Sequence, residues 1–167
     1  MRIDPKKPEA IPLGAKAAKT ETLEDLLESA FPLDTDDAVL YWNEIPVPIS
    51  YKYDLPVMIE EIEEVIEAVV DGESTSVQWP SNTFRATWHL RRYGERMKIA
   101  AEWESVAHNR EIELNDSGEV EVEVTGFLEN WSKLIDTAQT ALLNAGYSED
   151  NCGDWDRLGS IIDSCRP

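Results

Sequence analysis

The sequence predicts an α+β fold, with a mostly antiparallel sheet of about five to seven strands and helices packed on one face. Residues 83–91 and 96–106 alternate apolar and polar side chains, as half-buried antiparallel strands do. A shorter strand is expected at residues 74–80. Residues 54–72 and 127–145 instead repeat apolar side chains every three or four positions, which is typical of helices that cover a sheet.

The chain is expected to divide into a flexible basic arm over residues 1–19 and a single α+β domain over residues 20–167. The arm is rich in Pro, Lys and Ala. The domain should begin with a short helix over residues 23–30, in which four apolar residues share a face. Strands are expected at residues 38–42 and 47–53, and the prolines around the second strand place it at a sheet edge.

Residues 54–72 form the most strongly patterned stretch. Asp54 can cap the start of this helix, and Gly72 can end it in a left-handed conformation. Like charges at helical spacing repel by roughly 0.2–0.5 kcal/mol per pair, so an all-acidic face indicates a role beyond solubility. The face opposite the apolar one carries the acidic residues Glu60, Glu61, Glu63, Glu64, Glu67 and Asp71, with no Lys or Arg.

The two alternating strands predict a hairpin with a loop at residues 92–95. This register would pair Trp88 with Ile99 on the buried face. It would also pair Arg85 with Glu102 on the wet face, as a salt bridge between neighbouring strands.

A second hairpin is predicted over residues 111–124, with a turn that contains glycine. Its register sets Glu113 opposite Glu121 and Glu111 opposite Glu123. Like charges directly across a ladder are destabilising. A local conflict without structural benefit tends to mark a functional surface, so the hairpin is a second candidate site.

The last part of the chain predicts two helices. Thr125 is expected to cap a helix over residues 127–145, and a shorter helix is expected near residues 154–164. Cys152 and Cys165 are too few for a disulfide framework and are expected to be reduced thiols, although they could pair with each other.

Charge and hydropathy limit the classes of partner. The net charge is −19, and residues 21–73 hold 16 acids with Lys52 as their one base. Such a field disfavours nucleic acid and anionic membranes and favours a basic protein partner. No apolar run approaches the roughly 20 residues that span a bilayer, and the N-terminus lacks the apolar region of a secretory signal. A cytoplasmic location is therefore expected.

The residues that could carry chemistry do not form a recognisable catalytic motif. His89 and His108 are the only histidines, and no metal-ligand spacing or phosphate-binding loop occurs. His89 should lie on the wet face between Arg85 and Arg91, with no Ser or Cys convincingly beside it. We therefore expect a protein that is not an enzyme and uses no metal or cofactor.

The candidate partner-binding residues follow from the charge argument. Trp42 has an acidic neighbour, and an aromatic ring among carboxylates can anchor an Arg- or Lys-rich partner, although burial is the alternative. The candidate residues are Glu60, Glu61, Glu64, Glu67, Asp71, Glu111, Glu113, Glu121, Glu123 and Trp42.

The segment YWNEIPVPI, and the acidic helix that runs into SVQWP, resemble the bacterial immunity proteins encoded beside polymorphic and contact-dependent toxins. The resemblance covers residues 38–146 and rests also on size and strand order. It implies a cytoplasmic, non-enzymatic protein that binds and neutralises a cognate basic toxin domain, often a nuclease or deaminase. It carries over no functional residue. The alternatives are a DNA mimic or other acidic protein-binding adaptor without a toxin partner, and a structural domain whose acidity is incidental.

Overall fold

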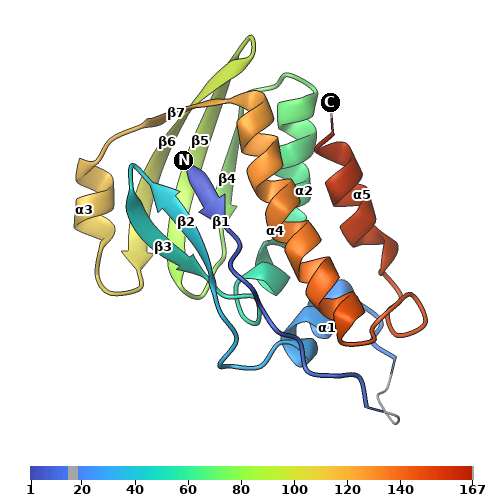
Figure 1. Ribbon diagram of the computed structural model, residues 1–167. Coiled ribbons are helices and arrows are strands. Elements are labelled where there is room, and N and C mark those ends of the chain that lie inside the picture. Colours follow the sequence, from blue (N-terminus) through green and yellow to red (C-terminus); the bar gives the residue numbers. More distant parts are fainter. Residues whose placement is uncertain (15–18, 167) are drawn as a thin grey trace.

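The computed structural model describes residues 1–14 and 19–166, which form two antiparallel sheets and five helices (Figure 1). The three-stranded sheet has the order β1-β2-β3, made of Arg2–Asp4, Ala38–Trp42 and Ile45–Ile49. The four-stranded sheet has the order β4-β5-β6-β7, made of Thr75–Trp79, Phe84–Tyr93, Arg96–Val106 and Val120–Glu123. The helices are α1 Leu23–Ala30, α2 Leu55–Val70, α3 Glu111–Asp116, α4 Val124–Asn144 and α5 Asp156–Ser164.

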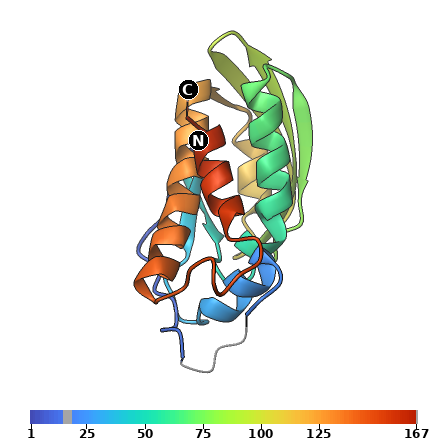
Figure 2. The ribbon, with the colours of Figure 1, turned by 90° about the vertical axis from the view of Figure 1, so that its right-hand side faces the viewer.

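The α+β class and the number of strands are confirmed, but the strands are divided between two sheets. Helices α2 and α4 and the three-stranded sheet share one face of the four-stranded sheet. Figure 2 shows the four-stranded sheet nearly edge-on, with α2, α4 and α5 on one side and its outer face open. The expectation that one sheet face stays wet therefore holds for the four-stranded sheet.

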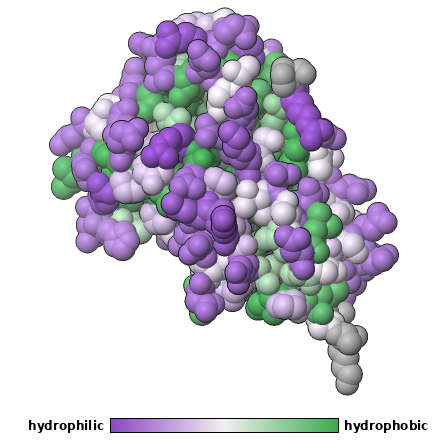
Figure 3. All heavy atoms as spheres, viewed as in Figure 1, coloured by the Kyte–Doolittle hydropathy of each residue, from purple (hydrophilic) through white to green (hydrophobic). Residues whose placement is uncertain are grey.

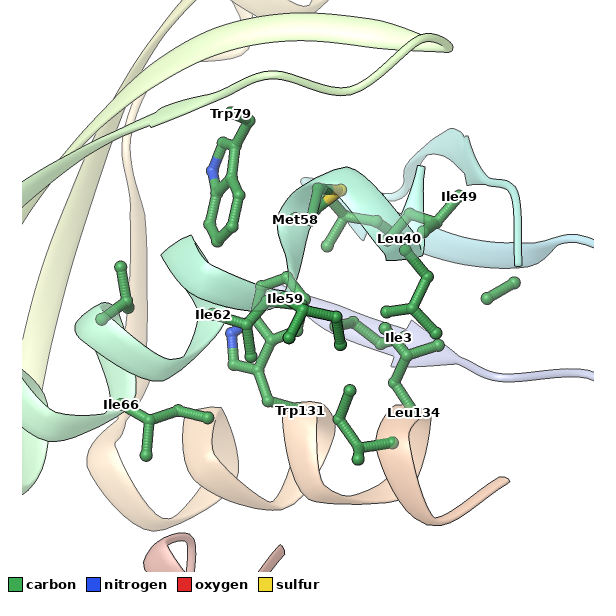
Figure 4. Packing of buried hydrophobic residues seen from close by; sticks show 14 of the residues in the cluster. Ile3, Leu40, Ile49, Met58, Ile59, Ile62, Ile66, Trp79, Trp131 and Leu134 are labelled. Carbon is green, nitrogen blue, oxygen red and sulfur yellow. The ribbon is translucent and has the colours of Figure 1, made fainter. Parts of the chain in front are cut away.

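Five buried tryptophans join these layers. Trp42 of β2 contacts Trp88 and Trp103 of the larger sheet, with ring centroids 5.3 and 5.4 Å apart. Trp79 of β4 stacks on Trp131 of α4 at 5.3 Å. Figure 4 shows apolar side chains of α2 lying between these last two rings and the small sheet. Large aromatic side chains dominate core energetics, so this cluster fixes how sheets and helices meet.

Residues 1–14 contact the rest of the domain, where a separate arm was expected. Ile3 is buried, and its strand β1 pairs with β2. The Ile3 amide also donates to the Asn130 side chain of α4 at 2.7 Å. Further along, the Ile11 amide donates to the Ala30 carbonyl at 2.7 Å. These backbone bonds stabilise a segment of weak local propensity; the rest of the predicted arm, residues 15–18, lies outside the described residues.

The first two strands and the helix after them follow the predicted pattern with adjusted ends. β3 runs from Ile45 to Ile49 and not to residue 53, and it lies at a sheet edge as its prolines predict. Asp54 does not cap α2. Its buried carboxylate accepts from the Ser50 amide at 2.6 Å and from the Thr83 amide and hydroxyl at 3.0 and 2.7 Å. Asp54 therefore ties the start of α2 to the loop before β5.

The β5–β6 hairpin forms with a register two residues away from the predicted one. Leu90, not Trp88, lies opposite Ile99. A further register shift between Arg85 and Ala86 sets Arg85 opposite Ser105 instead of the predicted Glu102. The turn is tighter than expected because its glycine takes the left-handed conformation, with φ of 63°. From Ala86 to the turn, a shift of two residues leaves the side chains on their predicted faces.

The predicted hairpin over residues 111–124 does not form. Its first half is helix α3, and its second half contains only β7, which pairs with β6. This pairing sets Glu121 opposite Lys98 and Glu123 opposite Arg96. Opposite charges therefore face each other where like charges were predicted, which is the favourable arrangement.

The C-terminal part confirms both predicted helices. α4 begins at Val124, so Thr125 lies inside the helix and makes no cap. The helix ends before Gly146, whose φ is 95°. Cys152 and Cys165 are free and buried, and burial raises the pKa of the Cys165 thiol from 9.0 to about 11. Within the part of the chain described, no helix combines the length and hydropathy needed to cross a membrane.

Candidate functional site

Helix α2 carries three exposed carboxylates, Glu60, Glu64 and Glu67, in a row that Asp71 continues at the C-cap; we call these four residues the α2 acidic row. The row faces solvent because the opposite face of the helix is fixed in the core by its buried apolar residues. Among the residues that the structure describes, none of the four carboxylates forms an ion pair. The row is therefore uncompensated negative charge on a rigid element.

A groove between α2 and α5 lies beside this row. It has a volume of about 410 Å³, an apolar floor that includes Ile66, Val70 and Ile161, and a rim that includes Glu67 and Asp71. Two members of the α2 acidic row thus border a partly apolar hollow. Such a combination suits a partner that presents an apolar anchor flanked by basic side chains.

Arg157 of α5 holds the two helices that form this groove. Its guanidinium binds Glu63 of α2 at 2.6 Å and Glu24 of α1 at 2.7 Å. The hydrogen bond to Glu63 is the main cause that raises the pKa of Arg157. Glu63 belongs to the acidic face predicted for the helix, but Arg157 neutralises it, so it does not extend the free row.

Glu61 was predicted to belong to the partner-binding set, but it points away from the row. Its side chain is half-buried and lines a hollow of about 350 Å³ with Trp79 and Arg85. One of its carboxylate oxygens is buried without a hydrogen-bond partner in the described structure. Burial raises the pKa of Glu61, and the nearby Glu60 and Glu64 charges raise it further.

The second predicted acidic set does not form a common surface. Glu111 and Glu113 lie on α3, whereas Glu121 and Glu123 lie on β7. Arg110 binds Glu113 at 2.8 Å, and Arg96 binds Glu121 at 2.9 Å. β7 is at the opposite edge of the sheet from β4, against which α2 packs. The two predicted sets are therefore separate, and two members of the second are neutralised.

Trp42 is a core residue, which corrects its interpretation as an exposed anchor. Its relative exposure is 0%, and its indole nitrogen donates to the Gly118 carbonyl at 3.1 Å. The alternation of β2 carries the signal for this, since Ala38, Leu40 and Trp42 share its buried face. A ring in this position packs in the core and is not accessible to a binding partner.

A polar cluster that the sequence did not reveal lies on the outer face of the four-stranded sheet. Ser76 of β4 lies opposite His89 of β5, and its hydroxyl is 2.7 Å from His89 Nδ1. The other ring nitrogen is 3.8 Å from the Glu102 carboxylate. Only the pairing of β4 with β5, which the sequence did not predict, would have placed Ser76 beside His89. In hydrolases the serine hydroxyl instead binds Nε2 and the carboxylate binds Nδ1, so this geometry is not theirs.

Comparison with known proteins adds no assignment. Protein-family models, curated proteins and solved structures give no significant match to the chain. In residues 1–14 and 19–166, no three His, Cys, Asp or Glu side chains gather in a way that could hold a metal ion. Figure 3 shows a mostly hydrophilic face with small, separate apolar patches. The α2 acidic row and its groove are therefore the best-supported candidate site, on their own geometry.

Proposed function

We propose that the protein is an acidic immunity or inhibitor protein whose α2 acidic row captures a basic toxin domain in the cytoplasm. The observation that carries the proposal is the row itself: four exposed carboxylates along one helix and its C-cap, without an ion-pair partner in the described chain. The neighbouring α2–α5 groove supplies apolar surface for an anchor. Binding here requires no enzyme activity, metal or cofactor.

Mutual repulsion within the row supports a partner-binding role. Each like-charged pair at helical spacing costs the free helix roughly 0.2–0.5 kcal/mol, which a partner's Lys and Arg side chains would relieve. Opposed charge fields also speed association, which suits a protein that must act before its toxin does. Toxins that cleave or modify nucleic acid need a positive cleft for phosphates, so an acidic row complements them.

A DNA mimic or other acidic adaptor is the second candidate. It is favoured by the same carboxylates, but a duplex presents two phosphate backbones. The residues that could have formed a second row, on α3 and β7, are dispersed and partly paired with arginines. The remaining single row fits a local cationic ridge on a protein better than a groove shaped for duplex DNA.

Charge reversal tests the proposal. The partner to use is the product of the adjacent gene, which the proposal expects to contain a basic toxin domain. Changing Glu60, Glu64 and Glu67 to Lys should raise the dissociation constant at least about 100-fold and abolish rescue of cells that express the toxin. The matched control changes Glu95, Asp116 and Glu149 to Lys, which are also exposed and alter the net charge equally. The control should retain rescue and most of the affinity.

Calorimetry on the purified pair and circular dichroism of each variant separate loss of binding from loss of folding. Equal loss of affinity in both triple variants would show that total charge, and not the α2 acidic row, determines binding. A neighbouring toxin that is not bound by the wild-type protein would contradict the immunity role.

A further inference from the structure

The outer face of the four-stranded sheet carries several cations in a strongly acidic protein, alongside Glu102, Glu121 and Glu123. Arg85, Arg91 and Lys98 are exposed on this face, together with His89. Within the described residues, none of the three permanent cations forms an ion pair. Arg92 is different, because its guanidinium donates to the Val69 and Val70 carbonyls at the end of α2. The cations of the outer face therefore have no comparable structural task.

Arg91 and Lys98 lie directly opposite each other on β5 and β6. Like charges at such a position destabilise a sheet, and most sheets avoid them. Lys98 does face Glu121 on its other side, but the Glu121 carboxylate binds Arg96 at 2.9 Å. The cost of placing two cations side by side is thus not offset by a carboxylate bound to either of them.

Arg91 and Lys98 border a hollow with a volume of about 610 Å³. Small side chains leave the space: Ser74, Thr75 and Ser76 on one side and Ala100 on the floor. The hydroxyl groups add hydrogen-bond donors, and Ser76 is already oriented by its 2.7 Å contact with His89. The hollow therefore combines permanent cations with neutral donors, which is the set that binds phosphate oxygens.

We propose that this hollow binds the phosphate group of a small phosphomonoester, with Arg91 and Lys98 as the main contacts. A volume of about 610 Å³ lies within the range of small-molecule sites. Glu119 also lines the hollow, and its carboxylate can accept hydrogen bonds from hydroxyl groups on the rest of the ligand. The net charge of −19 repels extended polyanions, which favours a ligand with one phosphate over nucleic acid. This site is independent of the α2 acidic row.

The test is titration of the purified protein with inorganic phosphate, AMP and adenosine, followed by amide chemical shifts in NMR spectra. Phosphate and AMP should give saturable shifts in β4, β5 and β6 around the hollow, whereas adenosine should give none. The double variant Arg91→Gln/Lys98→Gln should weaken AMP binding at least tenfold. The single variant Arg85→Gln, an exposed cation on the same face but outside the hollow, should weaken it less than twofold.

Three results would overturn the proposal. One is the absence of saturable chemical-shift changes when phosphate or AMP is added to wild-type protein that gives the spectrum of a folded chain. Another is equal weakening by Arg85→Gln, which would indicate a diffuse charge effect. The third is binding of a 12-nucleotide single strand more than tenfold tighter than AMP, which would make the face a nucleic-acid surface. The altered side chains are exposed, so the folded spectrum of each variant should be retained.

Discussion

Glu61 illustrates how two neighbouring carboxylates on one helix acquire different properties. Glu60 is exposed, whereas Glu61 is half-buried beside Trp79, with one carboxylate oxygen that lacks a hydrogen-bond partner in the described structure. Burial raises the pKa of Glu61, so its ionised form opposes folding. The stabilising effect of the protonated form is present below the ordinary pKa of 4.5 and is lost as pH rises through the folded-state pKa.

The variant Glu61→Gln should therefore be more stable than the wild type at pH 7. We expect a gain of at most about 1 kcal/mol in the free energy of unfolding. The variant removes a half-buried negative charge, one oxygen of which lacks a hydrogen-bond partner in the described structure. The gain should shrink as the pH approaches 4. Urea unfolding at a series of pH values measures it. Glu60→Gln is the control, and it should gain only the roughly 0.2–0.5 kcal/mol of a relieved surface repulsion; an equal gain in both variants would refute the burial argument.

Individual residues also show where sequence patterns stop being informative. Trp42 has acidic neighbours in the sequence, but the alternation of its strand places it in the core, with 0% exposure. The Ser76–His89 contact at 2.7 Å depends on how two strands pair, and neither residue's local sequence contains that information. The type of a residue predicts the chemistry of its side chain, whereas the pairing of strands determines which residues lie beside it.

At the scale of elements, long periodic patterns were sufficient to predict the type of element and its buried face, whereas short patterns were not. Helices α2 and α4 and strands β5 and β6 have the predicted buried faces. The segment of α3 offers only Ile112 and Leu114 as apolar markers, and two residues fit a strand or a helix. Its helical form is held by Asn115, whose side chain binds the Trp103 amide and carbonyl, each at 2.9 Å. That contact with β6 is tertiary, so local sequence could not reveal it.

The pairing of β5 with β6 makes a second stability prediction. Replacing Arg91 by Glu converts its like-charged pair with Lys98 into an opposite-charged one. The free energy of unfolding should rise by about 0.2–1 kcal/mol at low salt, and the gain should fall as salt is added. Thermal or urea unfolding provides the measurement.

Arg91→Gln is the matched control for this change, because it removes the repulsion with Lys98 without adding an opposite charge. It should raise stability by less than Arg91→Glu. A loss of stability in Arg91→Glu would mean that the observed register does not bring the Arg91 and Lys98 charges together.

The whole molecule is organised by contacts that are distant in sequence. Strand alternation predicted which faces are buried, but it did not predict that seven strands divide into two sheets. That division depends on Trp42 meeting Trp88 and Trp103 across the core. Likewise, the N-terminal residues are ordered by β2 and by α1, both of which they reach only in the folded chain.

The distribution of acidic and basic side chains is also set at the scale of the whole molecule. The exposed acids of α2 lie beside the α5 groove, and cations without an ion pair among the described residues lie on the open sheet face. The sequence predicted the α2 acidic row because its members share one helix. It did not predict the groove, since α5 is about 90 residues further along the chain, nor the dispersal of the acids on α3 and β7. The partner-binding role of the row stays a prediction.

Hydrogen exchange, measured with and without the toxin domain that the proposal expects from the adjacent gene, tests that role most directly. Binding at the α2 acidic row should slow exchange in α2 and α5, which border the row and its groove, and leave α3 and β7 unchanged. Protection confined to α3 and β7, or to the outer face of the sheet, would contradict the proposed role.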